Sequence, residues 1–306
     1  MARHLSGRVL LGLLTIVGVL VLTFLLLFVV PGDPARGVAG PRASEETLEV
    51  VRQNLKLDEP LSAQLGNYLA GVAQGDLGIS YKRLEPVTTM IADALPNTLL
   101  LAVAGLSVSI LLGSLVGLLD GLRRRRSFIV ATVNIGLLSV PAYALGLGLL
   151  IVFGYELGWA PVTGGVGAAE LVLPALTLGM FGVPYYANVV RDAVQEATGA
   201  AYTRTAVAKG LSRGLILRRH VLRNAVSPLI TMAGLDFALY LSGVVFVESI
   251  FAWPGIGLLQ TQAFSDLDRP VLMGTVIVAA VAVVVANLAA DVIRSFVDPR
   301  ARLEAS

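Results

Sequence analysis

Long apolar runs dominate the chain. Five of them contain no Asp, Glu, Lys or Arg, and a sixth contains one acid, Asp236. In order, the runs cover residues 9–30, 97–119, 127–155, 171–190, 227–247 and 271–290. A helix needs about 20 apolar residues to cross the roughly 30 Å hydrocarbon core, and a helix pairs its own backbone groups in lipid. The pattern therefore predicts an all-α integral membrane protein with six transmembrane helices.

Composition points to lipid as the solvent for most of the chain. Hydrophobic residues make up 56% of the sequence and charged residues 14%, whereas soluble domains carry nearer a quarter charged residues. The absence of cysteine excludes disulfides and thiolate metal sites, and the two histidines, His4 and His220, belong to no ligand pattern. We therefore expect no catalytic residue, bound cofactor or metal site on this chain, and no nucleic-acid partner.

The basic residues indicate how the spans are oriented. With the N-terminus inside, the inner segments 1–8, 120–126, 191–226 and 291–306 carry 16 of the 23 Lys and Arg residues. Six of the other seven lie in one long outer segment, where such a bias counts for little. Both termini are therefore predicted to be cytoplasmic.

Three regions follow from these spans. Residues 1–30 hold the first transmembrane helix, which at 22 apolar residues is too long for a cleaved signal segment. Residues 31–96 are predicted to form an extracytoplasmic insertion of short helices, one starting at Ser44 and another running from Leu61 to Leu69. Residues 97–306 form a five-helix core.

The longest inner segment, 191–226, is predicted to hold two short helices. The first runs through Tyr202–Lys209 and stops at Gly210, and the second starts with Ser212 as its N-cap. As a basic surface helix this segment could bind anionic lipid. Its small residues favour close docking of a protein instead.

A set of motifs runs in order along nearly the whole chain. The inner segment contains Arg204, Thr205, Ala206, Val207, Ala208, Lys209, Gly210, Leu211 and Ser212, then RHVLRNA at 219–225 and Pro228. Outside it lie PGDP at 31–34, GDLG at 75–78, LPNTL at 95–99, LPALTL at 173–178, VESIF at 247–251 and DPR at 298–300. In these residues the chain resembles permease subunits of binding-protein-dependent ABC importers, and more narrowly the dipeptide/oligopeptide/nickel branch. Arg204-Thr205-Ala206 replaces the Glu-Ala-Ala of the broader superfamily, as in that branch.

The resemblance implies a fold, partners and a location. The fold is the type I ABC importer permease (MetI-like) fold, with the insertion between helices 1 and 2. The partners are a second, homologous permease, one or two cytoplasmic ABC ATPases that dock on Arg204–Ser212, and an extracytoplasmic substrate-binding protein. The location is the prokaryotic plasma (inner) membrane. The substrates are dipeptides or oligopeptides, with nickel chelates and related solutes left open.

The sequence itself assigns ATP hydrolysis to another chain. Its three lysines, Lys56, Lys82 and Lys209, follow leucine, tyrosine and alanine, so no G-x-x-x-x-G-K-[ST] phosphate-binding loop is present. ATP and Mg²⁺ are therefore expected on the partner ATPases.

Three polar residues are candidates for lining the translocation path. Asp236 lies within a span, where a charge costs about 2.5–3.5 kcal/mol and faces a wet cavity or a partner. It either lines the path, meeting a peptide amino group, or pairs with a polar residue of a neighbouring subunit. Glu248 is equally consistent with interfacial packing and with gate lining. Asn188 is favoured for an interhelix hydrogen bond over the path.

An ion-coupled secondary transporter that uses Asp236 is the alternative function. Such transporters often show more spans, inverted repeats and paired broken helices, and no internal repeat is visible here. A membrane scaffold would explain the basic segment but not the ordered motifs. An intramembrane enzyme would need a catalytic constellation that the sequence lacks.

Overall fold

The computed structural model describes residues 2–29, 33–40, 42–54, 57–123, 126–161, 164–217 and 222–297. Within these ranges the structure is helical, apart from one isolated β-bridge between Ile79 and Pro86. The helices are α1 (Ala2–Val29), α2 (Pro34–Ala39), α3 (Glu45–Asn54), α4 (Leu61–Ala73), α5 (Val87–Gly121), α6 (Phe128–Ser139), α7 (Ala142–Leu149), the π-helix η1 (Leu150–Glu156), α8 (Ala168–Gly199), α9 (Ala201–Ala208), α10 (Arg213–Ile216), α11 (Leu222–Ile250), α12 (Ile256–Ser265) and α13 (Arg269–Val297). The predicted all-helical class is confirmed for the described residues.

Four of these helices are long and apolar enough to cross a membrane: α1, α5, α8 and α13. Two further spans would be bent pairs, one made of α6 with α7–η1 and the other made of two parts of α11. Within the described residues the count is therefore four, or up to six if each bent pair is one span. The predicted number of six remains a prediction.

The third apolar run, 127–155, is not one straight helix. Its two parts meet at 103°, because Val140 and Pro141 adopt extended conformations between α6 and α7 (ψ of 126° and 145°). Proline disfavours the helical conformation of the residue before it and lacks the amide for a helical hydrogen bond. The chain therefore turns sharply at Pro141, whereas α8 continues through Pro174 and Pro184.

The most extensive helix pair, α5 with α8, packs along a seam of small residues. A buried small residue recurs at every fourth position of α5: Gly105, Ser109, Gly113, Gly117 and Gly121. A Cβ on Gly105 would lie 2.8 Å from Leu178, and one on Gly121 would lie 2.9 Å from Val194. Small residues at a helix interface let the backbones approach closely.

The order of these contacts shows that α5 and α8 run parallel. Contacts on α8 move from Leu178 to Val194 as those on α5 move from Gly105 to Gly121. The chain between the two helices must therefore return to the end at which α5 began. The run 127–155 makes this return despite its turn.

Among the described residues between α1 and α5 lie three short helices, α2, α3 and α4; that this segment is an extracytoplasmic insertion remains a prediction. Ser44 caps α3 by accepting a hydrogen bond from the Thr47 amide at 3.2 Å, and α4 begins at Leu61 after Pro60. One boundary differs, because α5 begins at Val87 and not at Asn97. Asp93 and Pro96 ended the apolar run in the sequence, but both lie inside the helix.

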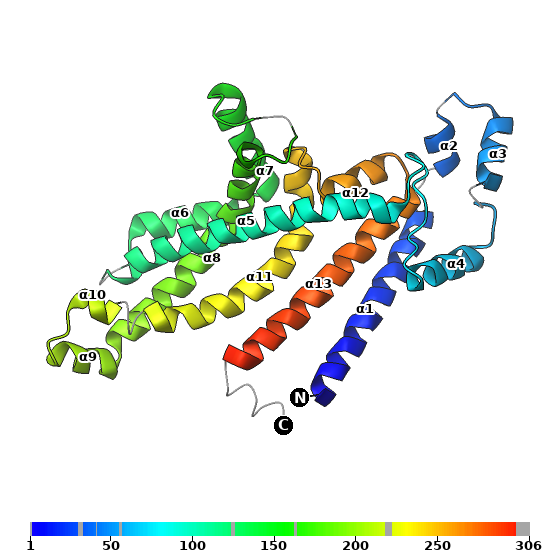
Figure 1. The fold of residues 1–306 in the computed structure, drawn as a ribbon. Helices are drawn as coiled ribbons and strands as arrows, with labels where there is room; N and C mark the ends of the chain where they lie inside the picture. The colour runs from blue at the N-terminus through cyan, green and yellow to red at the C-terminus, as the bar shows by residue number, and fades with distance from the viewer. Residues whose placement is uncertain are drawn as a thin grey trace.

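The short helices lie at different ends of the molecule (Figure 1). α1 starts at the end of the bundle that includes the termini, whereas α9 and α10 project at the far lower left of the view. The short helices α2 and α3 lie at the upper right, α4 lies below them on the right, and α7 rises at the top. One buried apolar cluster joins α1, α5, α12 and α13, and a second joins α5, α8 and α11.

Candidate coupling loop and polar clusters of the bundle

The inner loop forms the two predicted short helices. α9 (Ala201–Ala208) follows Ala200, whose extended conformation separates it from α8. Gly210 ends the turn after α9 with a φ of +75°, which favours glycine. The Ser212 carbonyl then accepts the Ile216 amide at 3.0 Å as the α10 turn begins. Residues 218–221 of the motif lie outside the described residues.

One face of α9 is attached to the end of α8. The Thr203 hydroxyl donates to the Ala197 carbonyl at 2.6 Å, and Ala206 is 5% exposed. Sequence reasoning assigned the small side chain of Ala206 to close approach of a partner, but the structure uses it inside the chain. The opposite face exposes Tyr202 and Val207.

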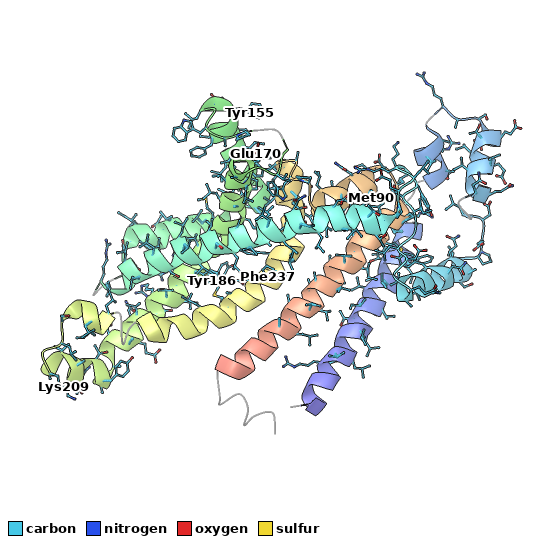
Figure 2. The ribbon with its side chains drawn as sticks, viewed as in Figure 1. Met90, Tyr155, Glu170, Tyr186, Lys209 and Phe237 are labelled. Atoms are coloured by element: carbon cyan, nitrogen blue, oxygen red, sulfur yellow. The ribbon has the colours of Figure 1, made fainter. Side chains whose placement is uncertain are left out.

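The exposed face of α9 is both apolar and basic. Val207 is 61% exposed and Tyr202 is 43% exposed, and Arg204 and Lys209 lie on the exposed surface with them. Figure 2 shows Lys209 at the tip of this projection, away from the other helices. Such a surface can bury its apolar side chains against a partner protein, while its positive charges favour a partner whose binding surface is edged by acidic residues.

A buried ion pair lies between this loop and the bundle. Arg191 Nε is 2.9 Å from Asp120 Oδ2, and the Asp120 side chain is 1% exposed. The other Asp120 oxygen accepts the Ser127 amide at 2.8 Å, where α6 begins. The pair therefore ties together the ends of α5 and α8 and the start of α6. Sequence reasoning placed Asp120 in a surface loop.

Asn188 lies beside this ion pair and not beside Asp236. Its Oδ1 accepts a hydrogen bond from Arg126 at 2.8 Å. The bond joins α8 to the loop before α6 and not to a second helix, so it engages the Asn188 side chain without being the interhelix bond that the sequence favoured.

Glu248 is buried at the junction of α5, α11 and α12, with an exposure of 0%. Its Oε1 accepts from the Thr98 hydroxyl at 2.7 Å, and its Oε2 accepts from the amides of Gly257 at 2.7 Å and Leu258 at 3.1 Å. A carboxylate at the first turn of α12 satisfies amides that have no partner in the helix. Of the two roles that the sequence left open, this geometry favours packing.

The same junction explains two sequence motifs. The Trp253 indole donates to the Asn97 carbonyl at 2.9 Å, and Asn97 donates to the Pro254 carbonyl at 2.8 Å. Thr98 also accepts the Ile256 amide at 2.8 Å. The LPNT and VESIFAWPGIG segments therefore form one interlocked unit. A Cβ on Gly257 would lie 3.0 Å from Glu248 Oε2.

A second carboxylate fixes the loop before α5. Asp268 is 3% exposed and accepts hydrogen bonds from the Ser80 hydroxyl at 2.5 Å and from the amides of Tyr81 and Lys82 at 3.1 and 3.2 Å. This contact joins the loop after the GDLG motif to the turn between α12 and α13. Sequence reasoning gave Asp268 no role, because its partners are mostly backbone amides.

A polar cluster crosses α5, α8 and α11 at their middle. The Ser109 hydroxyl donates to the Gly179 carbonyl at 2.7 Å and lies 2.6 Å from the Tyr240 hydroxyl. Asp236 is one helical turn before Tyr240, and its carboxylate lies next to the hydroxyl of Tyr186. In Figure 2, Tyr186 lies between α8 and α11, close to Phe237. The structure thus places the hydroxyls of Tyr186 and Tyr240 near Asp236.

In the part of the chain that the structure describes, no group of three or more His, Asp and Glu side chains could hold a metal ion.

The structure does not bring together the three residues proposed for the path. Glu248 lies 12 residues beyond Asp236 on α11, about 18 Å at the helical rise, and Asn188 bonds to Arg126.

Comparison with known proteins agrees with the fold and the motifs. A crystal structure of an amino acid ABC transporter with histidines matches with a TM-score of 0.51 at 15% identity, over 68% of this chain and 94% of that chain. This match shows a shared fold.

Relatives and family models cover nearly the full length of the chain. The glutathione transport system permease protein GsiC of Escherichia coli (strain K12) is 37% identical over 296 residues, 96% of this chain and 97% of the relative. GsiC of Salmonella choleraesuis (strain SC-B67) gives the same values. The model of the binding-protein-dependent transport system inner membrane component matches residues 109–303, and the model of its N-terminal part matches residues 1–102. The chain therefore belongs to the family of binding-protein-dependent transport system inner membrane components, the permease subunits of ABC importers.

Proposed function

We propose that this permease imports small peptides, from dipeptides to oligopeptides. The observation that carries the proposal is the 37% identity, over 96% of the chain, to a permease named for glutathione transport. Glutathione is itself a tripeptide. The GDLG, LPNT and VESIF motifs add support, because they resemble the dipeptide/oligopeptide/nickel branch.

The permease works as one part of a larger complex in this proposal. A second, homologous permease completes the path, one or two ATPases dock on Arg204–Ser212, and an extracytoplasmic binding protein delivers the peptide. The exposed Tyr202 and Val207 side chains between cations support docking of an ATPase on α9. The absence of a phosphate-binding loop from the sequence supports hydrolysis by another chain.

Six spans with both termini in the cytoplasm complete the proposed topology. The parallel packing of α5 and α8 supports a crossing by the run 127–155 between them. Three segments rich in Lys and Arg, 120–126, 191–226 and 291–306, then fall on the cytoplasmic side. The insertion 31–96 faces the binding protein.

Among the three candidate path residues, we retain only Asp236. Glu248 has its carboxylate engaged by Thr98 and α12, and Asn188 is bonded to Arg126. The alternative of an ion-coupled secondary transporter would make Asp236 a cation or proton site. The family, whose members work with a separate binding protein, favours the importer.

Co-purification with the genomic neighbours tests the complex. We expect a tagged chain to bring down a second permease and ATPases with phosphate-binding loops. Val207→Glu, on the exposed face of α9, should release the ATPases while the second permease stays bound. Val50→Glu is a matched control, because Val50 is 54% exposed on α3 at the opposite end. Transport of peptide down an ion gradient by the chain alone would contradict the proposal.

A further inference from the structure

Asp236 is an acid at the centre of a membrane-spanning helix. It lies 14 residues from each end of α11 (Leu222–Ile250), about 21 Å at the helical rise. The residue is half-buried, whereas Tyr186 is 0% exposed and Tyr240 is 9% exposed. The carboxylate therefore belongs to a polar cluster built by three helices and keeps one open side. Acids at this depth face a partner or a polar cavity.

The hydrogen bonds of the cluster leave acceptors free. Ser109 has a single hydroxyl hydrogen, which goes to the Gly179 carbonyl at 2.7 Å. In the 2.6 Å contact with Ser109, Tyr240 must therefore be the donor. The phenolic oxygen of Tyr240 also has a backbone hydrogen bond with Gly182, which leaves it one lone pair for a further hydrogen bond.

Tyr186 supplies a second oxygen without a fixed partner. Its hydroxyl lies next to the Asp236 carboxylate, but among the described residues the buried oxygen has no hydrogen-bond partner of good geometry. The backbone holds this side chain firmly, because its Cβ packs against Gly113 of the α5 seam. A buried hydroxyl without a hydrogen-bond partner calls for an explanation, and a ligand that reaches Asp236 would supply one.

We propose that Asp236, Tyr186 and Tyr240 form a binding station for the α-ammonium group of a peptide on its way through the permease. An ammonium group carries three N–H donors, and this cluster offers a carboxylate and two phenolic oxygens. The carboxylate supplies the opposite charge, and the tyrosine rings favour a cation over an anion. This inference rests on the proposed peptide import and adds the chemical group that the permease recognises.

The station also explains how a charged group crosses an apolar bundle. A lone ammonium would lose its hydration at the centre of the membrane at a large cost. Pairing with Asp236 replaces that hydration for the ammonium and removes an unpaired acid from the apo bundle at the same time. Peptides whose amino terminus is acetylated cannot make this exchange.

Transport by the complete reconstituted importer tests the station. The probes are trialanine and N-acetyl-trialanine, each supplied at a concentration that saturates the binding protein. We expect the wild type to move trialanine at least tenfold faster. In Asp236→Asn, trialanine uptake should fall 10–100-fold and N-acetyl-trialanine uptake less than twofold. Tyr186→Phe and Tyr240→Phe should each lower trialanine uptake about 3–10-fold. Glu156→Gln, at an exposed acid of η1, is the control.

A second measurement does not depend on the binding protein. Because the chain has no cysteine, Ala233→Cys places a single thiol within one turn of Asp236. Trialanine should slow labelling of this thiol in the purified complex, and N-acetyl-trialanine should not. Asp236→Asn should abolish the protection by trialanine.

The outcomes separate the two proposals. If the wild type moves both probes and Asp236→Asn changes neither uptake nor labelling, the station is refuted while peptide import stands. An equal loss for both probes, or loss of the second permease from the complex, would instead assign Asp236 to subunit pairing. An assembled wild type that moves and binds neither probe would refute peptide import and the station with it.

Discussion

The Glu248 junction gives the sharpest prediction about stability. Its carboxylate accepts the amides of Gly257 and Leu258 as well as the Thr98 hydroxyl. Glu248→Ala leaves two amides of the first turn of α12 without an acceptor. Each orphaned buried amide costs about 1–3 kcal/mol, so the variant should lose about 2–6 kcal/mol. Glu248→Gln keeps one acceptor oxygen but loses the charge, and hydrogen bonds to charged groups are about twice as strong as neutral ones. It should lose less.

Hydrogen–deuterium exchange of the purified complex measures this effect locally. At about 1.4 kcal/mol per tenfold, a local loss of about 3 kcal/mol should speed exchange of the α12 amides by roughly 100-fold. Glu156→Ala, at an exposed acid of η1, should leave this exchange unchanged. Unaltered exchange over 256–265 in Glu248→Ala would refute the idea that Glu248 caps α12.

Three further predictions concern other contacts. Gly117→Val should lower the thermal stability of the complex by about 1–3 kcal/mol or more, because a Cβ added there would lie 2.9 Å from Val190. Gly136→Val should not lower it, because a Cβ added at Gly136 would have nothing within 4 Å. Equal melting temperatures for the two variants would refute close packing along the seam. Asp120→Asn and Arg191→Gln should each lower the free energy of unfolding by about 3–5 kcal/mol. In a double-mutant cycle measured by thermal unfolding, the double variant should lose clearly less than the sum of the two. Additive losses would show that the ion pair at 2.9 Å carries no coupling energy. Burial alone would raise the pKa of Asp33, but hydrogen bonds from Arg52 and the Ala35 amide, together with nearby arginine charges, lower it below 3.8; the Asp33–Arg52 contact should therefore persist above that value and be lost as the pH falls through the lowered pKa. Pepsin cleavage within 42–54 should rise in the wild type as the pH falls through this lowered pKa, whereas Asp33→Asn should be cleaved equally above and below it. A wild type whose cleavage does not change across this pKa would contradict the Asp33–Arg52 contact.

Local signals in the sequence predicted the short elements well. Ser44 followed by two acids marked the start of α3, and Gly210 marked the end of the turn after α9, because capping and positive φ depend on neighbouring residues. Apolar length located the runs that form α1, α8 and α13. The motif order located the candidate coupling loop, whose role in docking the ATPases stays a prediction.

Contacts across the chain were not predictable in the same way. Glu248 and Asp268 are held largely by backbone amides, which every residue carries, so no residue type marks the partners. The helices α6, α7 and η1 lie between Asp120 and Arg191 in the chain, and charge alone placed both residues at the inner surface. The seam on α5 was visible in the sequence as a small residue at every fourth position from Gly105 to Gly121. Its partner helix could not be chosen without the structure.

Close packing along the seam makes α5 and α8 a rigid pair of helices. α5 carries Thr98 of the Glu248 junction near one end and Asp120 of the buried ion pair at the other, about 33 Å apart at the helical rise. Close backbone packing to α8 between these points resists bending and sliding. A force applied to α9, which is bonded to the end of α8, would therefore tilt α5 and α8 together as one rigid body and move the opposite end of α5. The length of α5 then turns a small tilt at the end that carries α9 into a larger displacement at the opposite end.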